Sequence, residues 1–243
     1  MEHNLLLFTL CVVPSLILMW YIYIKDKVEK EPLFLLILLF AGGIISAIIS
    51  SSISITLNLY IPFLNYQYSD MNIIQILIKS FVVIAVVEEI SKWIIGFICT
   101  WRNKNFNHIF DPIVYSVFIS LGFATFENLL YGYAFSSYGF MPILLRGIIS
   151  VPCHAAFGVF MGYYLGIAKN SQASDKNNKK TKYIFFSIIF PIIFHFIYDI
   201  LLINPNKISY AVFVIYVALL YCLAYLKIKK LNSKNNLIQK KEI

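Results

Sequence analysis

The sequence has little charge. Asp, Glu, Lys and Arg make up 13% of its 243 residues and hydrophobic residues make up 60%, whereas a typical soluble domain has roughly 25% and 45–50%. Such a chain cannot hide its apolar side chains in one aqueous core, which excludes an ordinary soluble domain. We therefore predict an integral membrane protein of the all-α class, because helices satisfy their own backbone hydrogen bonds inside a bilayer.

Several familiar motifs are also missing. There is no P-loop, no dinucleotide fingerprint and no GxSxG nucleophile elbow. The HExxH pattern of many zinc proteases is absent as well, which argues against a metal site of that type without excluding others. Cysteine is rare and shows no metal-type pairing, so we expect small buried hydrophobic side chains at Cys11, Cys99, Cys153 and Cys222.

What the chain does have is long apolar runs. A transmembrane helix needs about 20 mainly apolar residues, and seven stretches qualify. Asp111 and Pro112 predict an N-cap and a first helical residue at the start of the fourth. The expected polytopic bundle of about seven transmembrane helices spans residues 5–24, 33–57, 73–99, 112–135, 141–168, 183–203 and 208–226.

The basic residues alternate between the loops. Sixteen of the twenty Lys and Arg lie after the first, third and fifth spans and in the C-terminal segment, and only Lys207 lies in a loop on the other side. By the positive-inside rule, the N-terminus is outside and the C-terminus inside. The net charge of +8 then reflects topology and attraction to membrane lipid, and we expect no nucleic-acid partner. We predict one membrane domain over residues 1–230 and a flexible basic cytoplasmic tail over residues 231–243.

Polar residues inside the third and fourth spans are the strongest indication of function. Even on a lenient scale, a charged residue at the centre of a membrane helix costs roughly 2.5 to 3.5 kcal/mol. Glu88 and Lys92 are four residues apart and share a helix face, whereas Glu89 is rotated by about 100°. Glu127 and Tyr131 occupy one stripe of the fourth span. The alternatives are an ion pair that fixes helix register and a hydrogen bond between helices.

Spans five and six add further polar groups. Arg146 and His154 lie on one predicted face with Ser150, although Arg146 near the outer end has snorkelling as its alternative. His195 and Asp199 are one helical turn apart, so the carboxylate can orient the ring, or the two simply pair within the bundle. Three chemistries fit this set: peptide hydrolysis by carboxylate-activated water, metal-activated water, and a proton or ion path.

The motifs together resemble a known family. Glu88-Glu89-x-x-Lys92, Phe123-x-x-x-Glu127, His154-Ala155 and His195-x-x-x-Asp199 occur in order and resemble the PrsW-type intramembrane proteases, which are related to CAAX prenyl endopeptidases and Abi proteins. The Asp26-to-Pro32 loop, Asp111 and Arg146 also fit. The resemblance covers about residues 20–200.

The resemblance implies a multi-pass protease of the bacterial plasma membrane. Its substrate would be a single-span membrane protein, typically an anti-sigma factor, cut at the first regulated step of stress signalling. Carried over, Glu88 would be the base that activates water and Glu89 its partner. His195 would assist, oriented by Asp199. Glu127 occupies the second-motif position, and Lys92, His154 and Arg146 line the site.

Three alternatives accompany this interpretation. A metal-dependent protease of the CAAX type would hold a divalent ion such as zinc, whereas the glutamate mechanism predicts no cofactor. A proton-coupled transporter or channel would use the same carboxylates, although no internal repeat pairs the two halves of the chain. A scaffold or immunity protein would keep the fold without the activity, yet all the motif residues are present.

Overall fold

A computed structural model describes residues 2–135, 139–174, 176–203, 207–234 and 238. In these ranges the chain is helical with no β-strand, which confirms the predicted all-α class. The long helices are α1 (Glu2–Lys25), α2 (Leu33–Tyr60), α5 (Asp111–Ala134), α7 (Ser150–Ala173), α8 (Asn177–Ile203) and α9 (Lys207–Asn232). Six helical segments of the described chain are long and apolar enough to cross a membrane, with α6 (Met141–Ile148) joined to α7 as one of them.

The predicted third span has a different local geometry. It is helical without interruption from Ile73 to Thr100, but it divides into α3 (Ile73–Ile78), the π-helical segment η3 (Lys79–Val86) and α4 (Val87–Thr100). No single one of these reaches the length of a membrane span, so the stretch is not among the six. Two short 3-10 turns, η1 (Pro62–Asn65) and η2 (Tyr68–Asp70), precede it. The π-helical turns end at Val86, two residues before Glu88, and such turns are frequent at functional sites.

The predicted fifth span is interrupted. Helix α6 ends at Ile148, and α7 begins at Ser150, so the segment bends at Ile149. Pro152 has no backbone N–H to donate to the carbonyl four residues earlier, and this weakens the helix at that point. Arg146 therefore lies in α6 and His154 in α7, but Arg146, Ser150 and His154 still line one common cavity, as their predicted common face implies.

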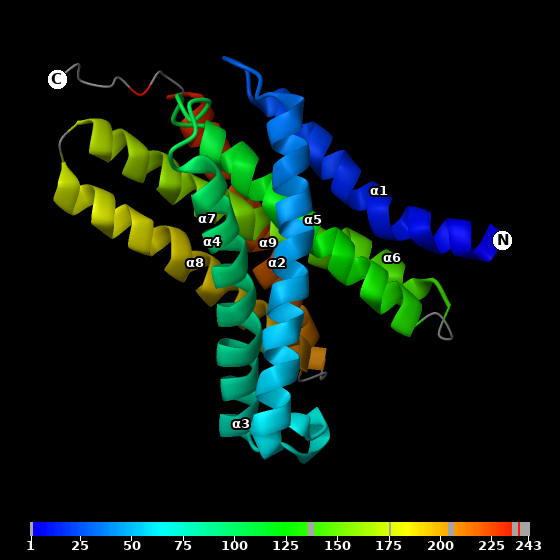
Figure 1. Cartoon of the computed structure of the whole chain (residues 1–243). Coiled ribbons are helices and arrows are strands. Elements are labelled where there is room, and N and C mark those ends of the chain that lie inside the picture. Colours follow the sequence, from blue (N-terminus) through cyan, green and yellow to red (C-terminus); the bar gives the residue numbers. More distant parts are fainter. Residues whose placement is uncertain (1, 136–138, 175, 204–206, 235–237, 239–243) are drawn as a thin grey trace.

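Helices α5 and α7 form the core. They pack most extensively on each other, with α2 and α8 against their outer sides, and Figure 1 shows α5 crossing the middle of the bundle. A Cβ atom at Gly162 would lie 2.2 Å from the carbonyl oxygen of Pro112, and one at Gly122 would lie 2.1 Å from that of Phe40. Only glycine permits these backbones to approach so closely, and small residues are typical of tightly packed membrane helices.

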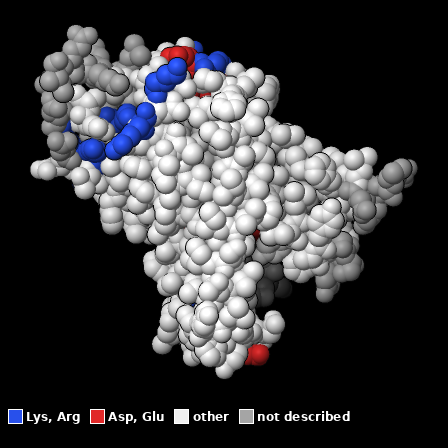
Figure 2. Space-filling view, in the orientation of Figure 1, with Lys and Arg blue, Asp and Glu red and all other residues white. Residues whose placement is uncertain are grey.

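Charged side chains gather at one end of the bundle. Figure 2 shows lysine and arginine there, and Figure 1 places the α1–α2, α4–α5 and α7–α8 connections at the same end. This agrees with the alternation of basic loops, while the side of the membrane that this end faces remains a prediction. Helix α9 continues to Asn232, and most of the predicted tail, residues 235–237 and 239–243, lies outside the described residues. Asp111 is the first residue of α5, one position after its predicted place as N-cap.

Candidate active site

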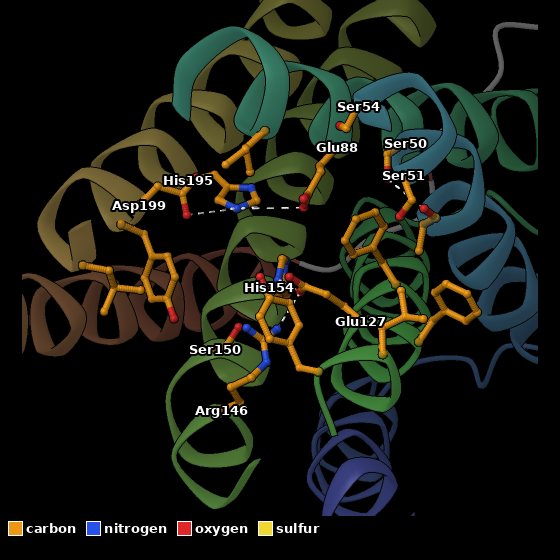
Figure 3. Close-up of a pocket in the computed structure, with 18 of the residues that line it drawn as sticks. Ser50, Ser51, Ser54, Glu88, Glu127, Arg146, Ser150, His154, His195 and Asp199 are labelled. Atoms are coloured by element: carbon orange, nitrogen blue, oxygen red, sulfur yellow. Dashed lines mark hydrogen bonds and ion pairs between the residues drawn. The ribbon is translucent and has the colours of Figure 1, made fainter. Parts of the chain in front are cut away.

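The intramembrane polar residues meet at one cavity of about 360 Å³. Residues from α2, η3, α4, α5, α6, α7 and α8 line it, and Figure 3 shows their side chains turned toward its centre. Six of the eight site residues predicted from the sequence line this cavity: Glu88, Glu127, Arg146, His154, His195 and Asp199. The other two, Glu89 and Lys92, lie directly behind them and are fully buried.

Lys92 is the cation at the centre of the first set of contacts. Its Nζ lies 2.7 Å from Glu89 Oε1, 3.1 Å from His154 Nδ1 and 3.8 Å from Glu88 Oε2. It also lies 3.8 Å from the centre of the Phe123 ring, a cation–π contact. The predicted pair of Glu88 and Lys92 is present at 3.8 Å, but the closer partner of Lys92 is Glu89, so the expectation that Glu89 points elsewhere is wrong. Residues three and four apart are both neighbours on a helix, so spacing did not decide between them.

Arg146 is the second cation. Its Nη2 lies 2.8 Å from Glu127 Oε2, and its Nε donates to Asn128 Oδ1 at 2.9 Å. His154 Nε2 lies 3.0 Å from the same Glu127 oxygen. Arg146 therefore reaches inward and does not snorkel toward the membrane surface. One ring nitrogen of His154 faces Lys92 and the other faces Glu127, the partner of Arg146. His154 therefore links the two charged pairs.

His195 links the two adjacent glutamates. Its Nδ1 lies 2.9 Å from Glu89 Oε1, while its Nε2 lies 3.9 Å from Glu88 Oε2 and 3.8 Å from Asp199 Oδ1. The ring also stacks on Phe157 at 5.0 Å between centroids. Glu89 therefore holds the imidazole by a direct hydrogen bond, whereas Asp199, the residue expected to orient the ring, lies at ion-pair distance, beyond hydrogen-bond distance.

Some carboxylate oxygens at the site have no hydrogen-bond partner among the described residues. Glu88 Oε2, Glu89 Oε2 and Asp199 Oδ2 are buried without a hydrogen bond. Glu88 and Asp199 line the cavity, whereas Glu89 does not. A buried acceptor without a partner is uncommon in a folded protein and asks for an explanation such as a catalytic role, a water or an ion.

One wall of the cavity was not predicted from the sequence. Ser50, Ser51 and Ser54 of α2 line the cavity opposite the charged groups (Figure 3). Ser54 Oγ donates to the carbonyl oxygen of Val83, so it ties α2 to the π-helical segment. The serine run at positions 50–52 was the available signal, but serine hydroxyls in membrane helices often bond only to their own helix.

The cavity also contains a donor set that suits a metal. Glu88, His154 and His195 each offer a ligand atom within 4.8 Å of the others, and mixed carboxylate and imidazole ligands are typical of catalytic zinc. His195 has the usual arrangement, with Nδ1 on a carboxylate and Nε2 toward the open position. His154 already uses both nitrogens. Of this set, Glu88 and His195 are the better candidates to hold a metal, and Asp199 Oδ1 lies 3.8 Å from His195 Nε2 beside them.

Comparisons with known proteins agree with this site. A family described as "PrsW family intramembrane metalloprotease" matches residues 31–226. Protease PrsW of Clostridioides difficile (strain 630) is 34% identical over 226 residues, which cover 92% of this chain and 90% of that protein. Protease PrsW of Oceanobacillus iheyensis is 33% identical over 91% of this chain and 94% of its own length. Protease PrsW of Bacillus subtilis (strain 168) is 32% identical over 79% of this chain and 80% of its own length. No solved structure matches the chain.

Proposed function

This chain belongs to the PrsW family of intramembrane proteases, and from that premise we propose that it cleaves a membrane-anchored protein by means of a water activated by Glu88. A multi-pass peptidase of a bacterial membrane is what the family and the apolar helices together establish. Family membership also favours hydrolysis over the transporter alternative.

The observation that supports Glu88 as the base is the difference between the two adjacent glutamates. Glu89 is fully buried, and Lys92 and His195 both engage its Oε1. Glu88 instead lines the cavity, with Oε2 free of hydrogen bonds and its side chain 16% exposed. A general base must reach the proton that it removes. Glu88 has that access, and Glu89 has the role of fixing its neighbours.

Residues of this site account for every proton transfer in the proposed hydrolysis. Glu88 removes a proton from water, and the resulting hydroxide attacks the peptide carbonyl carbon to form a tetrahedral oxyanion. His195 is held by Glu89 through Nδ1, so Nε2 faces the cavity, where a protonated ring donates to that oxyanion. When the C–N bond breaks, the proton held by Glu88 passes to the departing amine. The buried pairs of Lys92 with Glu89 and Arg146 with Glu127 keep these groups in position.

The substrate segment must be extended or unwound. A helical substrate hides its carbonyls in backbone hydrogen bonds, and a cavity of about 360 Å³ has room for only a few residues. The hydroxyls of Ser50, Ser51 and Ser54 supply partners for exposed peptide groups along the wall that faces Glu88. Following the resemblance, the proposed substrate is a single-span anti-sigma factor, cleaved at the first regulated step of a bacterial stress response.

A metal is the second candidate for activating the water. It is favoured by Glu88 Oε2, which has no hydrogen-bond partner and lies 3.9 Å from His195 Nε2, and by the Asp199 carboxylate, whose Oδ1 lies 3.8 Å from the same nitrogen. A bound zinc ion would lower the pKa of water and polarise the carbonyl. In that case Glu88, His195 and Asp199 would hold the ion, and Glu89 would still fix the His195 ring.

The test is reconstitution of the purified protein in liposomes with single-span anti-sigma factors from the same genome. We expect cleavage by the wild type and by Glu29→Gln, a matched Glu-to-Gln control whose side chain is exposed and outside the cavity. We expect no detectable cleavage with Glu88→Gln or His195→Ala. Cleavage that survives both changes would overturn the assignment. Loss of activity with a chelator, restored by zinc, would favour the metal over an unassisted carboxylate.

A further inference from the structure

A second group of buried carboxylates lies away from the active site. Asp26 and Glu31 come from the α1–α2 connection, and Asp111 is the first residue of α5. Their exposed fractions are 1%, 5% and 1%. Each offers an oxygen within 4.8 Å of the others, at the end of the bundle where these connections lie (Figure 1). Sixteen residues of α5, or about 24 Å, separate Asp111 from Glu127 of the active site.

Only some of the oxygens in this group accept hydrogen bonds from the protein. Glu31 Oε2 accepts from the Tyr115 hydroxyl at 2.7 Å. Asp111 Oδ2 accepts from the backbone N–H groups of Asn107 and His108 at 2.9 and 2.7 Å. Both oxygens of Asp26 and Oδ1 of Asp111 are buried without any hydrogen-bond partner. The buried Asp26 carboxylate therefore lies beside the other two, and neither of its oxygens accepts a hydrogen bond from the described residues.

The nearby cations are engaged elsewhere. Lys30 is exposed, and its ammonium donates to the backbone carbonyls of Tyr23 and Asp26. His108 Nδ1 is bonded to Asn107 Oδ1 and lies 3.5 Å from the exposed Glu29. In the part of the chain that the structure describes, no salt bridge joins a Lys, Arg or His to the three carboxylates.

We propose that Asp26, Glu31 and Asp111 bind a divalent cation that prefers oxygen ligands, of the Ca²⁺, Mg²⁺ or Mn²⁺ class. The donors are carboxylates alone, without the imidazole or thiolate that favours zinc. The two hydrogen-bonded carboxylates are already oriented, which leaves the free oxygens of Asp26 and Asp111 to coordinate. The cation joins the α1–α2 connection to the start of α5 and so anchors the two helices that α5 packs against at that end.

The test uses the metal-stripped full chain in nanodiscs of zwitterionic lipid, with Mn²⁺ as the probe and its paramagnetic resonance signal as the readout. We expect about one Mn²⁺ bound per chain above empty nanodiscs, displaced by Ca²⁺ or Mg²⁺. Asp26→Asn and Glu31→Gln should each weaken binding at least about tenfold, because carboxylate count sets the affinity of such sites. Glu29→Gln, next to the site but exposed, should bind as the wild type does.

Two further results decide the assignment. The active-site variant Glu88→Gln should retain the ion, so its loss there would place the metal in the cavity and overturn the proposal. Wild-type binding no greater than that of empty nanodiscs, or unchanged binding in both Asp26→Asn and Glu31→Gln, would also overturn it. In chelator, Asp26→Asn should melt at or above the wild-type temperature, because it removes a charge that has no partner. Poor folding of this variant in chelator would instead indicate a purely structural carboxylate.

Discussion

Buried carboxylates occur at two places along α5, and the protein treats them differently. Around the cavity, Glu88, Glu89, Glu127 and Asp199 share the space with Lys92 and Arg146, and two histidines join them. At the start of α5, the trio of Asp26, Glu31 and Asp111 accepts hydrogen bonds from neutral donors, and among the described residues it forms no salt bridge with a Lys, Arg or His.

Both clusters contain oxygens without partners, so an unsatisfied carboxylate does not by itself identify an active site. What distinguishes the cavity cluster is internal charge compensation, because Lys92 and Arg146 hold Glu89 and Glu127 in place while Glu88 remains accessible. The trio lacks this compensation and needs a proton or an added cation. The cluster whose negative charge is balanced by buried cations is thus the one proposed to carry out hydrolysis, and the cluster without such cations is the one proposed to bind an ion.

The largest expected effect is the loss of the base at the compensated cluster. Glu88→Gln should lower the rate of cleavage by about 10² to 10⁴, the usual contribution of a general base, because the amide cannot take the proton of water. The unfolding temperature should change little, since the main partner of Lys92 is Glu89. Initial rates of cleavage in proteoliposomes measure the effect, and a loss of less than tenfold would move the base to another residue.

A second substitution would remove a balancing positive charge from the cavity cluster. Lys92→Met removes a cation that is fully buried between Glu89 and His154. Breaking a buried pair from one side destabilises a protein by about 3–5 kcal/mol, so unfolding in denaturing detergent should occur at a much lower concentration. In the matched double variant, Lys92→Met with Glu89→Gln should recover a large part of the loss. Equal stability of the single and double variants would contradict the pairing.

The bundle itself could be predicted from the sequence because bilayer thickness and backbone hydrogen bonding leave few choices. The long apolar runs correspond to the long helices, and the polar residues inside them converge on one cavity. Local geometry was less predictable. The π-helical turns before Glu88 depend on how neighbouring helices pack, and hydrophobic runs do not record this. The interruption at Ile149 was not predicted, although Pro152 is visible in the sequence three residues later.

Which charged residues pair within the site could not be predicted from the sequence either. Helical spacing allows Lys92 to reach Glu88 or Glu89, and what distinguishes the two is that His195, 106 residues away in the chain, also contacts Glu89. The trio shows the same limit more strongly. Asp26 and Glu31 lie in a charged loop, where a solvent-exposed position is the default expectation, and only the folded chain brings Asp111 beside them.

A smaller effect is expected from pH at the uncompensated trio. Unfolded Asp and Glu have pKa values of about 3.9 and 4.3, whereas the folded values of Asp26 and Glu31 are about 6 and about 7. The folded chain therefore holds more protons over this interval, and its stability falls as the pH rises from about 4 to 7. In chelator, the wild-type melting temperature should drop more between pH 5 and pH 8 than that of Asp26→Asn.

Lys30, Glu29 and His108 surround the same trio, and they are identical in both proteins, so the difference between wild type and Asp26→Asn isolates the buried carboxylate. The titratable groups of the cavity are also identical in both proteins, so their contributions to the pH dependence cancel. Added Ca²⁺ should reduce the wild-type drop and leave that of Asp26→Asn unchanged. A parallel fall in both proteins would mean that the trio does not contribute to the pH dependence.

The smallest expected effect is at Asp199, the residue of the compensated cluster that most resembles Asp26. One of its oxygens has no partner, and the other lies 3.8 Å from His195 Nε2, beyond hydrogen-bond distance. Because Glu89 already fixes the ring through Nδ1, Asp199→Asn should slow cleavage by about tenfold or less, in keeping with the loss of a nearby charge. A loss as large as that of Glu88→Gln, reversed by added zinc, would instead make Asp199 a metal ligand, and the unpartnered oxygens of both clusters would then share one explanation.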